Sequence, residues 1–194
     1  GSPSPVKSSI PSSNSNDAYE LFKKDRLNFI RQITERKNRF VRLNEAVSSK
    51  GLTGLLDDVQ SNISHNCEMG YDILFVLSQF PENKKKDIKF EHASPIIDIC
   101  TAVLKSSISK KDLAVDTVDQ MTTYFGNLAL STLGMAEERG AANPAFEERK
   151  TKSENFVRSF KKCAIELNRL SKDLSSPVAQ KAKKILTQWP SLLK

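Results

Sequence analysis

Glycine, aromatic residues and long apolar runs are all scarce in this chain of 194 residues. Seven glycines are too few for the many tight turns of a β-rich protein. The longest apolar runs, such as Ile73 to Leu77, are far shorter than the roughly 20 residues that a membrane-spanning helix needs. These shortages exclude a β-rich fold and a transmembrane protein.

Residues that carry catalysis or bind metals are also few. No spacing typical of a metal site or of a nucleophile and its base relates the histidines and cysteines, which are His65, His92, Cys67, Cys100 and Cys163. The glycines at 51–54 lack the Lys-Ser/Thr pair that follows a phosphate-binding loop. We therefore expect no enzyme, no metal and no cofactor. The cysteines are predicted to be free, buried thiols.

Positive charge is what the chain has in excess, because 30 Lys and Arg stand against 23 Asp and Glu, which gives a net charge of +7. Such a balance favours acidic protein segments, nucleic acid or anionic membrane surfaces as neighbours. Aromatic residues make up only 7% of the chain, so specific recognition of nucleic acid is not indicated. Weak nonspecific contact with nucleic acid stays open, and no membrane partner is expected.

Two parts of different composition follow one another. Residues 1–16 are rich in Ser, Pro and Asn and nearly free of apolar side chains, which predicts a disordered leader. Residues 17–194 are predicted to form a single helical domain, because their apolar residues recur at helical spacing. The chain is therefore predicted to be all-α, a helical bundle of stacked helix hairpins with a long N-terminal helix.

The helices of this domain can be placed by their apolar spacing and by their capping residues. The first is expected over 17–48, a short one over 52–63 and a central buried one over 68–80. Another begins at Ser94 and Pro95. A longer one is expected over 110–135, and its helical geometry is expected to be eased, that is loosened, at Gly126. After a linker over 138–152, helices are expected over 153–170 and from Pro177 to the end of the chain.

Two segments have similar patterns, "TAVLKSSISKKDLAVDTVDQMTTYF" and "IELNRLSKDLSSPVAQKAKKILTQW". Each pairs the end of one helix with a Ser/Lys loop and a second helix that reaches a bulky aromatic residue. Small or apolar residues align in the pairs Ala114 and Val178, Val118 and Ala182, Met121 and Ile185, and Phe125 and Trp189. This pattern predicts either a true repeat of stacked hairpins or two unrelated amphipathic hairpins.

Residues 153–194 also resemble a known family. The stretch "IELNRLSKDLSSPVAQKAKKILTQWPSLL" is similar to the end of the TFIIS N-terminal domain family and of its relative, the integrase-binding domain of lens epithelium-derived growth factor. Upstream, "DILFVLSQFP" and "IKFEHASPIIDICTAVLKS" look like the preceding helices of that family, with a long insertion at 107–152. A polymerase-tail-interacting domain remains an alternative.

The resemblance implies a non-enzymatic docking module of a transcription or chromatin factor. It implies that the module binds short acidic-hydrophobic segments of disordered partners and lies in the nucleus, with the cytoplasm as the alternative. The partner-binding residues would be Lys172, Leu174, Ser176, Lys181 and Lys184, with Leu174 entering the partner's surface and Lys172 beside it. Leu174 also stands in a loop tip with no apolar stripe to join.

Other functions fit the same helices. A helical scaffold or homo-oligomerisation bundle is the main alternative, and a membrane-surface or cytoskeletal bundle is another. The oligomeric state stays open. On either interpretation Trp189 is expected to be largely buried.

Overall fold

The computed structural model describes residues 51, 56, 67–80, 85–139 and 143–194. They form α5 (Cys67–Ser78), α7 (Phe90–Lys105), α8 (Asp112–Arg139), α9 (Pro144–Ser171), α10 (Pro177–Gln188) and the 3-10 helix η1 (Pro190–Leu193). No strand occurs among these residues, so the predicted all-α bundle is confirmed. The predicted leader over 1–16 and the long helix over 17–48 lie outside the described part of the chain.

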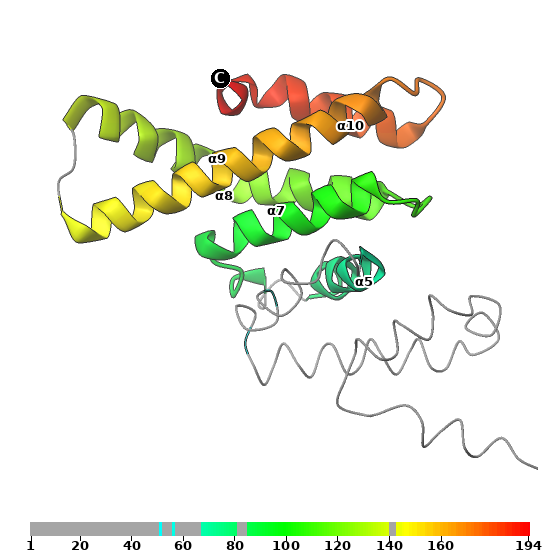
Figure 1. Ribbon diagram of the computed structural model, residues 1–194, viewed down its shortest axis with the longest axis horizontal. Helices are drawn as coiled ribbons and strands as arrows, with labels where there is room; N and C mark the ends of the chain where they lie inside the picture. The colour runs from blue at the N-terminus through cyan, green and yellow to red at the C-terminus, as the bar shows by residue number, and fades with distance from the viewer. Residues whose placement is uncertain (1–50, 52–55, 57–66, 81–84, 140–142) are drawn as a thin grey trace, which may run out of the picture.

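Two helix hairpins, α7–α8 and α9–α10, stack on one another in the same orientation (Figure 1). The hydroxyl oxygens of Ser94 in α7 and Ser159 in α9 are 2.6 Å apart. On the second pair of helices, Lys181 of α10 forms an ion pair with Asp116 of α8 at 3.1 Å. Helices α8 and α10 therefore lie side by side, as α7 and α9 do.

The aligned positions of the two similar segments face the core in both hairpins. All six helix positions of the alignment are buried, namely Ala114, Val118, Met121, Val178, Ala182 and Ile185. Each hairpin alone would leave this stripe in water, so stacking of one hairpin on the other stabilises both.

The core has α9 at its centre, because α9 packs against α7, α8 and α10. Phe156, Phe160 and Leu167 on its apolar stripe are fully buried. Helix α5 packs on the other side, against α7 and α8. The predicted burial of this apolar helix is borne out by Ile73 and Leu74, which are fully buried, although α9 and not α5 lies at the centre of the described bundle.

The start of α9 corrects the predicted linker over 138–152. Asn143 precedes the helix, and its side chain accepts a hydrogen bond from the backbone N–H of Phe146 at 2.9 Å. Pro144 occupies the first helical turn, where a missing N–H costs nothing. Residues 107–152 therefore contribute all of α8 and the beginning of α9, and they are not an insertion.

Helix α7 begins at Phe90, before the start predicted at Ser94 and Pro95. The Nδ1 atom of His92 accepts the backbone N–H of Lys89 at 2.9 Å and so caps the first turn. This local hydrogen bond satisfies a backbone donor that would otherwise have no partner, and Pro95 falls inside the helix. The role of His92 is thus structural.

Helix α8 runs unbroken past Gly126, so the predicted easing of the helix at this glycine is wrong. The indole ring of Trp189 lies against Gly126, and a Cβ atom there would be 2.6 Å from the ring atom Cζ3. Trp189 is only 8% exposed, which confirms its predicted burial. Glycine is needed at this position for close approach of the ring.

Candidate docking surfaces

The loop between α9 and α10 carries three of the five predicted partner-binding residues. Lys172 follows α9 and donates its backbone N–H to the last turn of the helix. Leu174 is 76% exposed, and Ser176 precedes α10 without a capping hydrogen bond from its side chain. Leu174 therefore lies in a loop tip as expected, and its role in binding stays a prediction.

The other two predicted residues, Lys181 and Lys184, lie on α10 and do not share one environment. Lys181 forms the ion pair with Asp116 of α8, and both side chains are about half exposed. Lys184 is exposed to solvent. The structure thus gathers Lys172, Leu174 and Ser176 in one loop and turns Lys181 towards the neighbouring hairpin.

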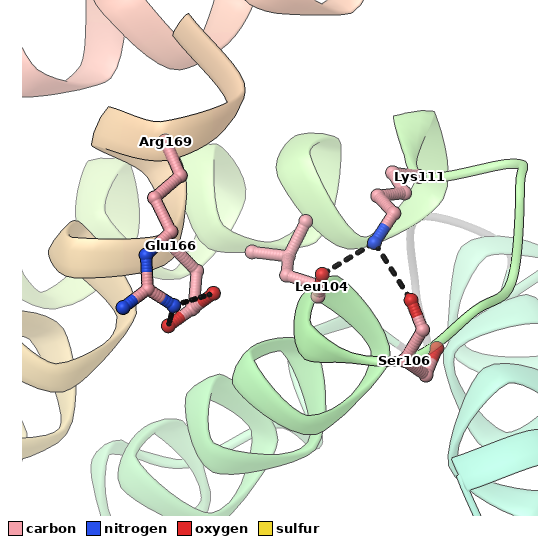
Figure 2. Close-up of polar contacts among 5 residues, drawn as sticks. All are labelled: Leu104, Ser106, Lys111, Glu166 and Arg169. Atoms are coloured by element: carbon pink, nitrogen blue, oxygen red, sulfur yellow. Dashed lines mark hydrogen bonds and ion pairs between the residues drawn. The ribbon is translucent and has the colours of Figure 1, made fainter.

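A polar cluster that sequence reasoning missed lies at this end of the bundle and consists of two sets of contacts (Figure 2). The ammonium group of Lys111 donates to the backbone oxygens of Leu104 and Ser106, where α7 ends. These carbonyls have no partner within the helix, and a cation is favourable near a helix C-terminus. A lysine a few residues after a helix end is the only sequence signal for such a contact.

The nearby carboxylate of Glu166 is buried in α9 and accepts two hydrogen bonds from Arg169, at 3.0 and 2.9 Å. Burial lowers the pKa of Lys111, and the charge of Glu166 opposes that shift. Lys111 thus holds the α7–α8 loop to the end of α7, and Arg169 pairs with Glu166 within α9. The charged groups of the cluster are occupied by these structural contacts.

One side of α8 is exposed and carries no charge over about four helical turns. No charged residue occurs between Asp119 and Glu137. We call the exposed and partly exposed positions on this side the α8 face, which consists of Gln120, Thr123, Tyr124, Asn127, Leu128, Ser131, Gly134 and Met135. Tyr124 is 46% exposed and Leu128 is 38% exposed.

The exposed sides of α9 and α10 differ in character from the α8 face. Those of α9 carry residues such as Arg158, Lys161 and Lys162, and those of α10 carry Lys183 and Lys184. Charged and polar side chains of this kind form an ordinary solvated surface. The α8 face lacks charge, as the cores of protein–protein interfaces do.

A second candidate surface is a pocket between the outer parts of α8 and α9. It has a volume of about 520 Å³. We call it the α8–α9 pocket, and it is lined by Leu133, Ala136, Glu137, Lys150, Glu154, Val157, Arg158, Lys161 and Lys194. The pocket and the α8 face have no residue in common.

The histidine, cysteine and acidic side chains of the described residues were also candidates for a metal site or a reactive thiol. No three His, Cys, Asp or Glu side chains in this part of the chain are grouped as metal ligands. Cys100 and Cys163 are free and buried, as predicted, and burial raises the pKa of Cys163 to about 12. Such thiols are unreactive. None of the described helices has the length and apolarity to span a bilayer.

Comparison with known families corrects the resemblance to the TFIIS N-terminal domain and the integrase-binding domain. A family model described as the con80 domain of katanin matches residues 24–189, whereas no curated protein and no solved structure matches. The earlier resemblance rested on a pattern of small inner residues in a hairpin, which stacked helices of many kinds share. The transcription and chromatin role inferred from it is unsupported, and so is the polymerase-tail alternative.

The match extends over most of the chain and includes every α-helix described above, from α5 to α10. Con80 is a protein–protein interaction domain, so the coarser prediction of a module with protein partners holds. The chain belongs to the family of the con80 domain of katanin.

Proposed function

We propose that the chain is a non-enzymatic docking module that binds the p60 subunit within a katanin microtubule-severing complex. The α8 face is the surface that supports this proposal best. It is an exposed side of a long core helix on which charge is absent and apolar and aromatic side chains are present. The partner would contribute a helix with an uncharged, partly apolar side.

The composition of the α8 face suits the centre of an interface. Tyrosine and methionine are enriched in interfaces, and removal of apolar surface from water supplies most of the free energy of association. Tyr124 and Leu128 are neighbours on the helix, since they are separated by one turn. The face is about 23 Å long from Gln120 to Met135, which is enough for several turns of a partner helix.

Acidic residues flank the α8 face at both ends. Asp119 precedes it, and Glu137 and Glu138 follow it. Charges at the rim of an interface act mainly on the rate and selectivity of association. A partner helix with basic residues beyond its apolar side would therefore be selected.

The test is a calorimetric titration of the full chain with p60, comparing wild type with Tyr124→Asp and Leu128→Asp. A buried charge without a partner is unfavourable in an interface, so each variant should weaken binding by about tenfold or more. Both positions are exposed in the chain alone, so its melting temperature should stay nearly unchanged.

Leu174→Asp is the matched comparison, because it places the same charge on another exposed leucine. It also tests the predicted loop site of Lys172, Leu174 and Ser176. Normal affinity for the two α8 variants together with a tenfold loss for Leu174→Asp would move the p60 site to the loop. Unchanged affinity in all three variants would reject both surfaces.

Several finer predictions remain open. Binding of acidic-hydrophobic segments and weak contact with nucleic acid are untested expectations. The nuclear location followed from the corrected resemblance and stays a prediction, which fluorescence microscopy of the tagged protein would check. The microtubule-severing family favours the cytoskeletal alternative among those weighed from the sequence.

A further inference from the structure

The α8–α9 pocket lies at the end of the bundle where α8 and α9 are longer than the helices packed against them. Helices α8 and α9 extend beyond η1 and beyond α7 (Figure 1). Helix α10 and η1 pack on both of them, and Leu192 of η1 is fully buried. Lys194, two residues later, lines the pocket. The surface covered by the last helix therefore continues as an open pocket.

The apolar part of the pocket is small but unfilled. Leu133 and Ala136 of α8 and Val157 of α9 line it, and each is only partly buried. A pocket of about 520 Å³ is large enough for one or two bulky side chains and the backbone between them. An apolar side chain placed there would remove these three residues from water.

The charges around these apolar residues are unbalanced. Four cationic side chains line the pocket, Lys150, Arg158, Lys161 and Lys194, against the carboxylates of Glu137 and Glu154. Among these side chains, two positive charges therefore remain in excess. No ion pair joins any two of these six side chains, whereas Lys152 and Glu148 on the same helix do form one.

We propose that the α8–α9 pocket binds a short segment of a partner protein that has one or two bulky apolar residues flanked by acidic residues. The apolar residues contact Leu133, Ala136 and Val157. The acidic residues lie against Arg158 and Lys161. The site is separate from the α8 face and does not depend on binding of p60.

Burial of the apolar anchors supplies most of the affinity, and the cations supply selection against basic segments. Arg158 and Lys161 are exposed, so their attraction for carboxylates is screened by salt. Affinity for the segment should therefore fall as salt rises, and part of it should remain at high salt.

The experiment uses the full chain and a short fluorescein-labelled peptide in which Leu and Phe stand between Asp and Glu residues. One control peptide has Lys in place of each acid, and another has Ser in place of Leu and Phe. Fluorescence anisotropy should show binding of the first peptide alone. In NMR spectra, the methyl signals of Leu133 and Val157 should shift during the same titration.

The decisive variants reverse two charges in different places. Arg158→Glu combined with Lys161→Glu should weaken binding of the acidic peptide by about tenfold or more. Lys183→Glu combined with Lys184→Glu changes the net charge equally on α10, outside the pocket, and should leave the affinity within about twofold. Both pairs are exposed, so folding should be retained.

The proposal is overturned if the acidic peptide does not bind, or if the basic peptide binds equally well. Equal weakening by the two double variants would mean that net charge alone attracts the peptide. Loss of p60 binding in the Arg158 and Lys161 variant would assign the pocket to the p60 interface. Retained p60 binding with lost peptide binding supports the pocket as a separate site.

Discussion

Gly126 and Gly134 stand two turns apart on α8 and have opposite surroundings. A Cβ atom at Gly126 would meet the indole ring of Trp189, whereas nothing lies within 4 Å of a Cβ atom at Gly134. Glycine in a helix is less favourable than alanine, because it loses more backbone freedom on folding. Of these two glycines, only Gly126 is required by packing within the chain, because only there would a side chain meet another residue.

We therefore expect Gly126→Ala and Gly134→Ala to change stability in opposite directions. Gly126→Ala should lower the free energy of unfolding by about 1–3 kcal/mol, since the rigid ring must move. Gly134→Ala should raise it by about 0.5–1 kcal/mol. Urea unfolding measures both, with the slope against urea as a check that the unfolded state is unchanged. Two changes of the same sign would contradict the placement of the ring.

Trp189 combines burial with an unmet polar group. Its Nε1 atom is buried and has no hydrogen-bond partner among the described residues. A buried donor without a partner costs free energy, so the close fit of the ring must outweigh that cost. The apolar surface of the indole ring, and not its N–H, accounts for its contribution to stability.

Helix α5 carries an acidic side chain, Asp72, on its buried side. Asp72 is 1% exposed, and burial raises its pKa from 3.8 to about 8. The folded chain therefore holds a proton on Asp72 across a pH range in which the unfolded chain has released it. Stability from this group is greatest below the unfolded pKa and is lost as pH rises towards 8.

Asp72→Asn keeps the shape of the side chain and removes this titration. The free energy of unfolding of wild type should fall relative to that of Asp72→Asn between about pH 5 and pH 8, by at most about 1.4 kcal/mol per pH unit. Urea unfolding at several pH values measures the difference. Parallel pH profiles for the two proteins would show that burial of α5 does not perturb this carboxyl group.

Helix α8 has two sides with different surroundings. Its buried side, with Val118, Met121 and Ala129, belongs to the core. Its uncharged outer side is covered by none of the described helices. A helix with an apolar inner side and an uncharged outer side is typical of a layer that lies between the core and a further protein.

At the scale of the whole molecule, the α8 face also bears on self-association. In a two-fold homodimer through this face, the acidic residues at its ends, Asp119 and Glu137, would lie near acidic residues of the second copy and repel them. We expect the full chain to sediment as a monomer over the micromolar range, and Leu128→Asp to sediment identically. A concentration-dependent dimer that Leu128→Asp abolishes would make a second copy of the chain the partner of this face.

The amino-acid sequence by itself determined the all-α class, the buried helix α5 and the stripes of α9 and α10, because these follow from local spacing of apolar residues. It also determined that Leu174 lacks a stripe to join. The linker predicted over 138–152 is wrong for its second half, because Asn143 and Pro144 cap the start of α9. The family was misjudged because one hairpin pattern fits many stacked helices.

Only the tertiary structure decided which exposed residues lie together. The sequence shows that the stretch from Gln120 to Met135 has no charge, but packing of α5, α7 and α9 decides which side of α8 stays in water. The α8–α9 pocket joins residues from Leu133 to Lys194, and its place depends on how far η1 reaches. Such sites depend on long-range packing, which has no local period for a sequence pattern to reveal.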